Sequence, residues 1–230
     1  MTAHSMSGPL YAILEGFQTL DKGGAYRILA ELIVLALLLL IAFPVHEWAH
    51  AWAARWLGDD TAERMGRLTL NPLRHLDPIG SLLFLVVGFG WAKPVPVNIH
   101  RLRGNPRRSY ALVALAGPVS NLILAILFAA LYRSIVPVLG INNTLGYVVG
   151  FALGTAVALN LILALFNLIP IPPLDGSRLL TAILPSRGQV IADQIERHGL
   201  IILIVLSVTG MLGRLIVRPA SVLSELLLGP

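Results

Sequence analysis

The sequence contains no cysteine, and only 13% of its residues are charged. The missing cysteine excludes disulfide bonds and thiolate ligands, so any metal ion must be held by histidine, aspartate or glutamate. The scarcity of charge accompanies a hydrophobic content of 56%, which excludes an ordinary soluble domain. Acidic residues are also absent from the whole stretch between Pro78 and Leu174. That stretch therefore supplies no carboxylate ligand and no carboxylate base.

Four long apolar runs, of about 20 residues or more, are each sufficient to cross a hydrocarbon core of about 30 Å. They lie near residues 27–45, 109–133, 147–169 and 199–217. A shorter run at 79–92 is interrupted by glycines and favours a re-entrant or shallow segment. We therefore expect an all-α polytopic integral membrane protein with four to five transmembrane helices and one re-entrant or extended membrane-associated segment. Residues 1–230 would form one domain, with a core at about 27–180 and an extra helix at about 199–217.

Basic residues predict the topology of these spans. Nine of the 17 Lys and Arg residues lie between Arg55 and Arg108, whereas residues 134–147 contain none. The positive-inside rule then places 55–108 and 171–198 on the cytoplasmic side and 134–147 outside. This bias and contact with anionic lipid explain the formal net charge of +5, so no nucleic acid partner is expected. Residues 1–26 lack a basic region followed by a cleavable apolar core, so no signal peptide is expected.

Residues 46–50 read HEWAH, at the end of the first apolar run. Residues four apart on an α-helix share a face, so His46 and His50 can offer two imidazole nitrogens to one tetrahedral Zn²⁺. Glu47 would then lie beside the metal, where its carboxylate can accept a proton from a water molecule. The alternative is a chance match, but histidines near a bilayer are costly without a function. The pattern favours metal-dependent hydrolysis of a peptide bond.

A zinc site needs a third protein ligand, and the first acid after the acid-free stretch is Asp175. Three prolines at 170, 172 and 173 stop a regular helix just before it, and irregular backbone at membrane depth is tolerated only against protein or a water-filled cavity. Asp175 is thus a candidate ligand, although alone it also fits an interfacial helix cap or turn residue. His75 is a further candidate, but a loop position suits it better because a catalytic zinc keeps its fourth position for water.

Three motifs together carry a resemblance to a known family. They are HEWAH at 46–50, AGPVSN at 116–121, and the stretch from Asn167 to Gly176, which follows the pattern N-x-x-P-x-P-x-x-D-G. The chain resembles the site-2 proteases, which are intramembrane zinc metalloproteases, in their compact type without PDZ or CBS domains. The resemblance implies one zinc on His46, His50 and Asp175, with Glu47 as the catalytic acid and base. It also implies single-span membrane protein substrates, such as anti-sigma factors or other regulators.

Two asparagines are candidates for substrate binding. Gly117 and Ser120 are small enough for two membrane helices to approach closely, which would bring Asn121 near the metal. Its amide could hold the scissile carbonyl, or it could form only a helix–helix hydrogen bond. Asn167 has a similar choice, because it could instead satisfy a backbone group freed by the prolines that follow. The stripe of Trp48, Trp52 and Trp56 favours packing or interfacial anchoring.

The segment 91–98 has the sequence WAKPVPVN. Prolines two apart remove amide donors along one edge of an extended chain and leave the Val95 and Val97 amides on the other edge. A transmembrane substrate must leave its helix before cleavage, and pairing it as a strand with this edge would hold it extended. We therefore expect Val95 and Val97 to bind substrate, although a stiff surface turn also explains the prolines.

The sequence as a whole predicts a zinc metalloendopeptidase of the cell membrane with its active site towards the cytoplasmic side. The reaction would be hydrolysis of a peptide bond in or near the transmembrane segment of a substrate, as in regulated intramembrane proteolysis. The alternative is a non-proteolytic zinc-containing adaptor that binds transmembrane helices, although such a site would not need Glu47. A zinc-dependent transporter would be expected to show an internal repeat, and the sequence shows none.

Overall fold

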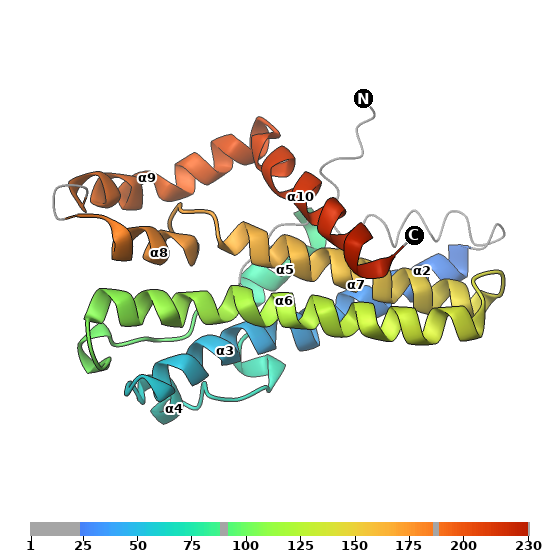
Figure 1. The fold of residues 1–230 in the computed structure, drawn as a ribbon, viewed down its shortest axis with the longest axis horizontal. Coiled ribbons are helices and arrows are strands. Elements are labelled where there is room, and N and C mark those ends of the chain that lie inside the picture. Colours follow the sequence, from blue (N-terminus) through green and yellow to red (C-terminus); the bar gives the residue numbers. More distant parts are fainter. Residues whose placement is uncertain (1–23, 88–91, 186–188, 230) are drawn as a thin grey trace.

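The computed structural model describes residues 24–87, 92–185 and 189–229. Its first long helix combines α2 (Gly24–Leu37), a π-helical turn η3 (Leu38–Ala42) and α3 (Phe43–Trp56), which together run without a break from Ala25 to Trp56. Helix α6 (Pro106–Leu139) and helix α7 (Thr144–Asn167) complete a bundle of three helices that are long and apolar enough to cross a membrane (Figure 1). The expectation of an all-α fold is therefore confirmed.

Local sequence explains where these helices begin. Asn105 and Asn143 precede α6 and α7, and each side chain accepts hydrogen bonds from backbone amides of the first turn. Between the two helices, Gly140 adopts a positive φ of 73°, a conformation that glycine adopts at little cost. The short connection returns the chain, so that α7 packs along α6. Their shared core includes the small residues Ala125, Ala129 and Ala156, which let membrane helices approach closely, beside the larger Phe128 and Leu161.

The apolar run at 199–217 is not one straight helix. Helix α9 (Gln189–Val208) and helix α10 (Met211–Leu228) meet at a bend of 73°, where Gly210 has a positive φ of 69°. Helix α10 then packs against α7, with Ala220 in their shared core (Figure 1). The described residues thus provide three full spans, or four if this bent pair counts as one.

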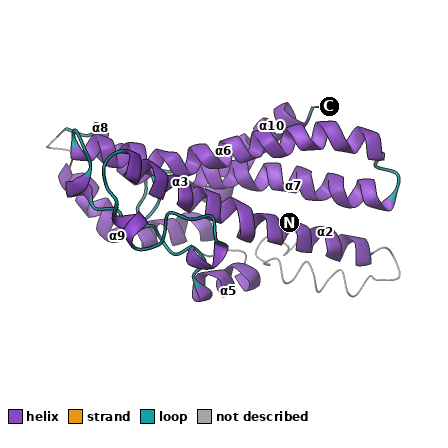
Figure 2. Cartoon of the chain, turned by 90° about the horizontal axis from the view of Figure 1, so that it is seen from below, coloured by secondary structure: helices purple, strands orange, loops and turns teal. Residues whose placement is uncertain are grey.

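The run at 79–92 forms only a short helix, α5 (Pro78–Val87), of 10 residues. At 1.5 Å per residue it extends about 15 Å, which is too short to cross a bilayer. Gly88, Gly90 and Trp91 lie outside the described residues. The same connection between α3 and α6 contains α4 (Thr61–Arg64) and the 3₁₀ turns η4 (Pro72–Arg74) and η5 (Ile99–Arg101). No strand is present in the ranges that the structure covers (Figure 2). An isolated antiparallel bridge joins Leu76 to Ala92.

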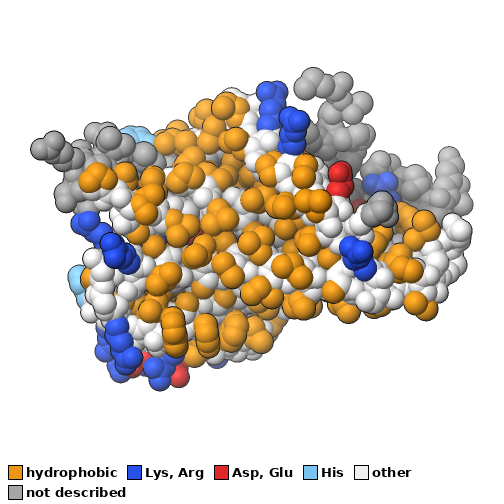
Figure 3. Space-filling model, in the orientation of Figure 1, with side chains coloured by type: hydrophobic (Ala, Val, Ile, Leu, Met, Phe, Trp, Pro, Cys, Tyr) orange, Lys and Arg blue, Asp and Glu red, His pale blue; other side chains and the backbone are white. Residues whose placement is uncertain are grey.

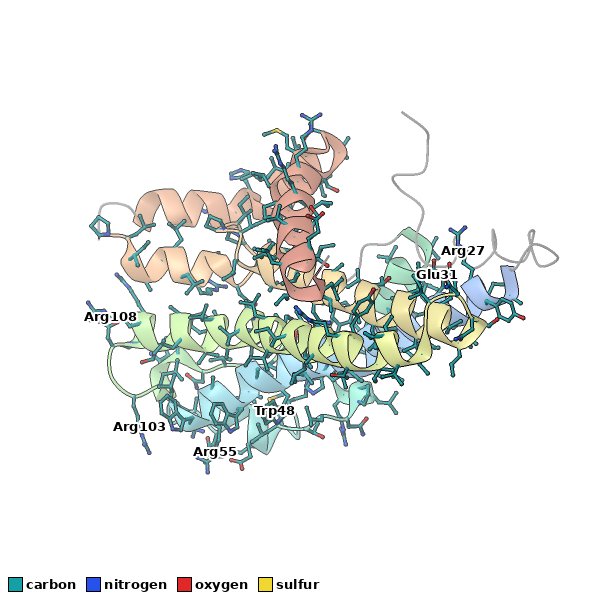
Figure 4. The ribbon with its side chains drawn as sticks, turned by 45° about the vertical axis from the view of Figure 1, so that its right-hand side comes forward. Arg27, Glu31, Trp48, Arg55, Arg103 and Arg108 are labelled. Atoms are coloured by element: carbon teal, nitrogen blue, oxygen red, sulfur yellow. The ribbon has the colours of Figure 1, made fainter. Side chains whose placement is uncertain are left out.

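The surface has the character of a multi-pass membrane protein. Large apolar side chains are exposed along the spans, and they cover most of the face shown in Figure 3, while most Lys and Arg side chains lie towards its edges. Arg27 and Glu31 lie at one end of the bundle, and Arg55, Arg103 and Arg108 lie at the other (Figure 4). Helix α4 of the connection, the start of α6 and residues 176–183, which follow α7, lie towards this second end (Figure 1).

Candidate metal centre

Three residues from two distant parts of the chain meet at one point. His46 and His50 lie on one face of α3, both buried, with their Nε2 atoms 3.0 Å apart. Asp175 immediately precedes α8 (Gly176–Ile183), and its Oδ2 lies 3.3 Å from each of these nitrogens. The prolines before Asp175 end α7 and turn the chain back, which brings the carboxylate to the imidazoles. The structure thus brings together the three residues that the sequence singled out as zinc ligands.

A chain of buried hydrogen bonds fixes the orientation of the His46 ring. The Ala156 carbonyl can only accept, so the Asn160 Nδ2 donates to it at 2.9 Å. The Asn160 Oδ1 then accepts from the Asn121 Nδ2 at 3.0 Å, which leaves the Asn121 Oδ1 facing the His46 Nδ1 at 2.6 Å. His46 must therefore carry its proton on Nδ1. Its Nε2 lone pair points to the meeting point of the three residues.

His50 is oriented in the same way by a backbone group. Its Nδ1 lies 2.8 Å from the Val113 carbonyl oxygen, an acceptor, so the proton is on Nδ1 and the Nε2 lone pair is free. The Asp175 Oδ2 is buried and has no hydrogen-bond donor among the described residues. Three electron-pair donors that face one another in this way could together hold a metal cation.

The donor set and its dimensions fit a zinc ion. Ligand atoms at 2.0–2.1 Å from a tetrahedral zinc lie about 3.3 Å from one another. The three observed separations are 3.0, 3.3 and 3.3 Å. Two nitrogens and one carboxylate oxygen leave the fourth position of a tetrahedron open, which is the arrangement of catalytic rather than structural zinc sites.

Two glycines allow the close packing that builds this centre. A Cβ on Gly117 of α6 would lie 2.4 Å from the His50 Nε2 and 2.6 Å from the His46 Cε1, so the α6 backbone lies directly against both rings. A Cβ on Gly176 would lie 2.2 Å from the Leu168 carbonyl oxygen, where the chain folds back on itself after α7. Any larger residue at either position would push the ligands apart.

Glu47 faces an extended segment, residues 92–98, instead of another helix. Its Oε2 accepts a hydrogen bond from the Val95 amide at 3.1 Å. The extended segment is attached near its two ends, because the Lys93 amide donates to the His75 carbonyl at 2.7 Å and the Asn98 amide donates to the Asp59 Oδ2 at 2.6 Å. The carboxylate next to the candidate ligand His46 is therefore held by a backbone amide from a segment about 50 residues further along the chain.

The structure gives the other predicted site residues different surroundings. Both amide atoms of Asn121 have protein partners, so its direct contact is with a ligand histidine. The Asn167 Nδ2 donates to the Leu163 carbonyl of its own helix at 3.0 Å. The Val95 amide is engaged by Glu47, whereas the Val97 amide has no hydrogen-bond partner within the described ranges. Roles in substrate binding remain predictions for all four residues.

His75 and the tryptophan stripe lie outside the ligand cluster. His75 is fully buried, and its Nε2 lies 2.6 Å from the Thr69 carbonyl oxygen, which fits the loop role that the sequence favoured. Trp48, Trp52 and Trp56 stack along α3 with ring centroids 6.2 and 6.4 Å apart, and the last two are exposed. Exposed stacked tryptophans at the end of a span are typical of interfacial anchors.

Three residues that help to hold the site in place were not singled out from the sequence: Asn160, Arg67 and Asp59. Asn160 was detectable, because an asparagine in the middle of the apolar run 147–169 must find a buried partner. Arg67 and Asp59 gave no comparable signal, since charged residues in a loop are usually solvated. Both are buried here, at 6% and 0% exposed, and both contact the extended segment.

Comparison with known proteins gives a consistent set of matches. The profile of peptidase family M50 matches residues 34–149 and 134–210. A Bacillus subtilis (strain 168) protein described as a zinc metalloprotease, YwhC, is 44% identical over 186 residues, which is 80% of this chain and 84% of the relative. Rip2 of Mycolicibacterium smegmatis, described likewise, is 33% identical over 180 residues, 76% of this chain and 66% of the relative. No solved structure matches the chain.

Proposed function

The chain belongs to peptidase family M50, the site-2 protease family, and we propose that this zinc metalloprotease hydrolyses a peptide bond in or near the transmembrane segment of a membrane protein. The observation that carries the proposal is the position of the site. His46, Glu47 and His50 lie on a helix that is apolar enough to span a membrane, and the two histidines face Asp175. Substrates would therefore meet the site at or below the membrane surface.

The residues around the site would divide the chemistry among them. His46, His50 and Asp175 would hold the zinc ion through Nε2, Nε2 and Oδ2. Zinc bound there would supply a Lewis acid that polarises the scissile carbonyl and makes a water molecule more acidic. Glu47 would accept a proton from the attacking water molecule while the water oxygen bonds to the carbonyl carbon. When the carbon–nitrogen bond breaks, Glu47 would return that proton to the leaving amine, so no proton is gained or lost.

The extended segment 92–98 would order the substrate beside Glu47. A helical substrate has to unwind, and an extended chain can pair with an unpaired backbone edge. Val97 carries the amide that remains without a partner in the described ranges, so it would pair directly with substrate. Val95 would contribute through its contact with Glu47. For Asn121 the observed contacts favour a role in orienting His46, and for Asn167 a substrate contact would use its amide oxygen or its second amide hydrogen, since one amide hydrogen goes to the Leu163 carbonyl.

The distribution of basic residues supports a cell-membrane location with the site towards the cytoplasm. The segments rich in Lys and Arg lie at the end of the bundle reached by α3, and the positive-inside rule assigns such an end to the cytoplasmic side. The whole chain would act as one domain on single-span membrane proteins, and the family resemblance suggests anti-sigma factors or other regulators. Lipid would cover the apolar faces of the spans.

The test is cleavage of a tagged single-span protein by the zinc-loaded chain, compared with Glu47→Gln. We expect Glu47→Gln to keep its zinc and to lose about 100-fold or more in turnover, because the ligands remain while the proton acceptor is gone. The matched control is Glu63→Gln, since Glu63 lies near the exposed end of α4 and pairs only with Arg55 among the residues described. Cleavage that persists in Glu47→Gln would contradict the mechanism. Zinc binding without any cleavage by the wild type would favour the adaptor.

A further inference from the structure

Arg67 is a buried cation whose guanidinium has too few partners for its burial to stabilise the fold. It is only 6% exposed, and its guanidinium donates to the carbonyl oxygens of Lys93 at 2.5 Å and Pro94 at 3.4 Å. Its Nε is buried without a hydrogen-bond partner, and no carboxylate forms an ion pair with it among the described residues. Burying an arginine with incomplete partners costs free energy. This cost suggests that Arg67 has a role at the site.

The two carbonyls that Arg67 holds directly precede the amide that holds Glu47. Pro94 and Pro96 have no amide hydrogen, so Val95 carries the one donor between Lys93 and Val97. That amide donates to the Glu47 Oε2. A shift of the backbone at residues 93–94 therefore moves the donor on Val95 directly. The anchors at His75 and Asp59 bind the Lys93 and Asn98 amides, and neither binds a carbonyl next to Val95.

We propose that Arg67 is a positioning residue for Glu47, which it orients through the Lys93 and Pro94 carbonyls and the Val95 amide. The inference rests on the proposed function, in which Glu47 transfers the proton. The hydrogen bonds of Arg67 go to backbone only. Val97, which would pair with substrate, lies next to the separate anchor of the Asn98 amide on Asp59, so loss of Arg67 would act mainly on how fast bound substrate reacts and would leave zinc binding unaltered. Misplacement of a reacting group by about 1 Å can cost about 100-fold in rate, so a modest backbone shift would have a large effect.

The experiment compares Arg67→Met, Arg67→Lys and Arg74→Met in the purified, zinc-loaded full chain, reconstituted with the tagged single-span substrate. Arg67→Met removes all the donors while keeping most of the side-chain stem, so kcat should fall about 100-fold with little change in KM. Arg67→Lys keeps one donor and should recover part of this loss. Arg74 lies on the same loop but is exposed, so Arg74→Met should behave as wild type. Zinc content should be equal in all of them.

A double-mutant cycle with Val95→Pro tests whether Arg67 acts through the Val95 amide. Val95→Pro removes that amide in a segment that is already extended, and it leaves Arg67 in place. If Arg67 acts on Glu47 through the Val95 amide, Arg67→Met should add little to the fall in kcat caused by Val95→Pro. A purely structural role for Arg67 would instead give losses that multiply. Multiplying losses, or a loss confined to KM, would overturn the proposal.

A measurement independent of activity separates this inference from the proposed function. Hydrogen exchange of the amides in residues 92–98 should speed up in Arg67→Met and stay as in wild type in Arg74→Met, with α3 unchanged in both. If exchange rises but no chain cleaves substrate, the proposed function is wrong while the Arg67 anchor exists. If the wild type cleaves and Arg67→Met changes neither exchange nor kcat, the positioning role is wrong and the protease assignment stands.

Discussion

The ligand cluster and the extended segment lie on either side of Glu47, yet they are held in place by different means. His46, His50 and Asp175 are fixed by helix packing, by the close approach of Gly117 and by a relay of buried amides. The segment 92–98 is fixed by a few separate hydrogen bonds: it accepts from Arg67 and donates to the His75 carbonyl, to Glu47 and to Asp59. The difference implies that zinc binding and turnover are separable: variants of the first region should lose metal, and variants of the second should keep it.

The largest effect should follow from removing a ligand. Asp175→Ala leaves two imidazoles, which hold zinc weakly, so the zinc content should fall from about one per chain towards zero, with complete loss of cleavage. Metal analysis of the purified variant after dialysis measures this. Asp77→Ala is a matched control, because Asp77 caps the start of α5 and lies outside the cluster. One tightly bound zinc in Asp175→Ala would mean that another residue is the third ligand.

A single methyl group added at Gly117 should have the next largest effect. The added Cβ of Gly117→Ala would lie within 2.6 Å of three atoms of the ligand rings, so either α6 or the imidazoles must move. We expect zinc affinity to fall at least about 10-fold, as it does when ligand orientation is lost. Gly213→Ala is the control, since a Cβ there meets no atom within 4 Å. If Gly117→Ala binds zinc as tightly as the wild type, helix packing does not set the ligand geometry.

The ligand cluster was predictable from the sequence because its signals are local. Helical periodicity places His46 and His50 on one face, and the acid-free stretch leaves Asp175 as the next carboxylate along the chain. The family resemblance joined these two pieces. The long apolar runs likewise predicted the spans at α6 and α7, because length and hydropathy suffice to identify a membrane helix.

The surroundings of the extended segment were not predictable, because they depend on tertiary contacts. Alternate prolines indicated an extended chain with one open edge, but nothing local showed that Glu47 would take the Val95 amide. Arg67 is an ordinary loop arginine until the fold buries it against residues 93–94. The bend between α9 and α10 has a visible marker in Gly210, yet a glycine within an apolar run does not by itself determine a bend.

The hydrogen-bond chain from Asn160 through Asn121 to His46 predicts a smaller effect, and this effect should again be on zinc affinity. Asn160→Leu removes the group that orients Asn121, so His46 loses its fixed tautomer while all three ligands remain. Loss of such an outer partner typically costs 10-fold to 100-fold in metal affinity, and we expect a weakening near the lower end of this range, about 10-fold, because all three candidate ligands remain in place. Competition with a chelator measures the affinity. Asn167→Leu should bind zinc as the wild type does, because the Asn167 amide bonds only within its own helix. Equal weakening by both variants would indicate general damage to α7.

The smallest effect should come from Val97, whose amide is the unpaired one on the edge of the extended segment. Val97→Pro removes a single pairing bond to substrate, and one neutral hydrogen bond contributes about 1 kcal/mol, so cleavage of a membrane-embedded substrate should slow about fivefold. Zinc content should not change. A soluble, already extended peptide has no helix to unwind and should be affected less, although it also loses the bond. Val95→Pro should behave differently, since it releases Glu47 and should slow both substrates equally. If the ratio of the cleavage rates on the two substrates is the same for both variants, Val95 and Val97 act in the same way. If Val97→Pro cleaves both substrates at the wild-type rate, the segment only supports Glu47 and does not pair with substrate.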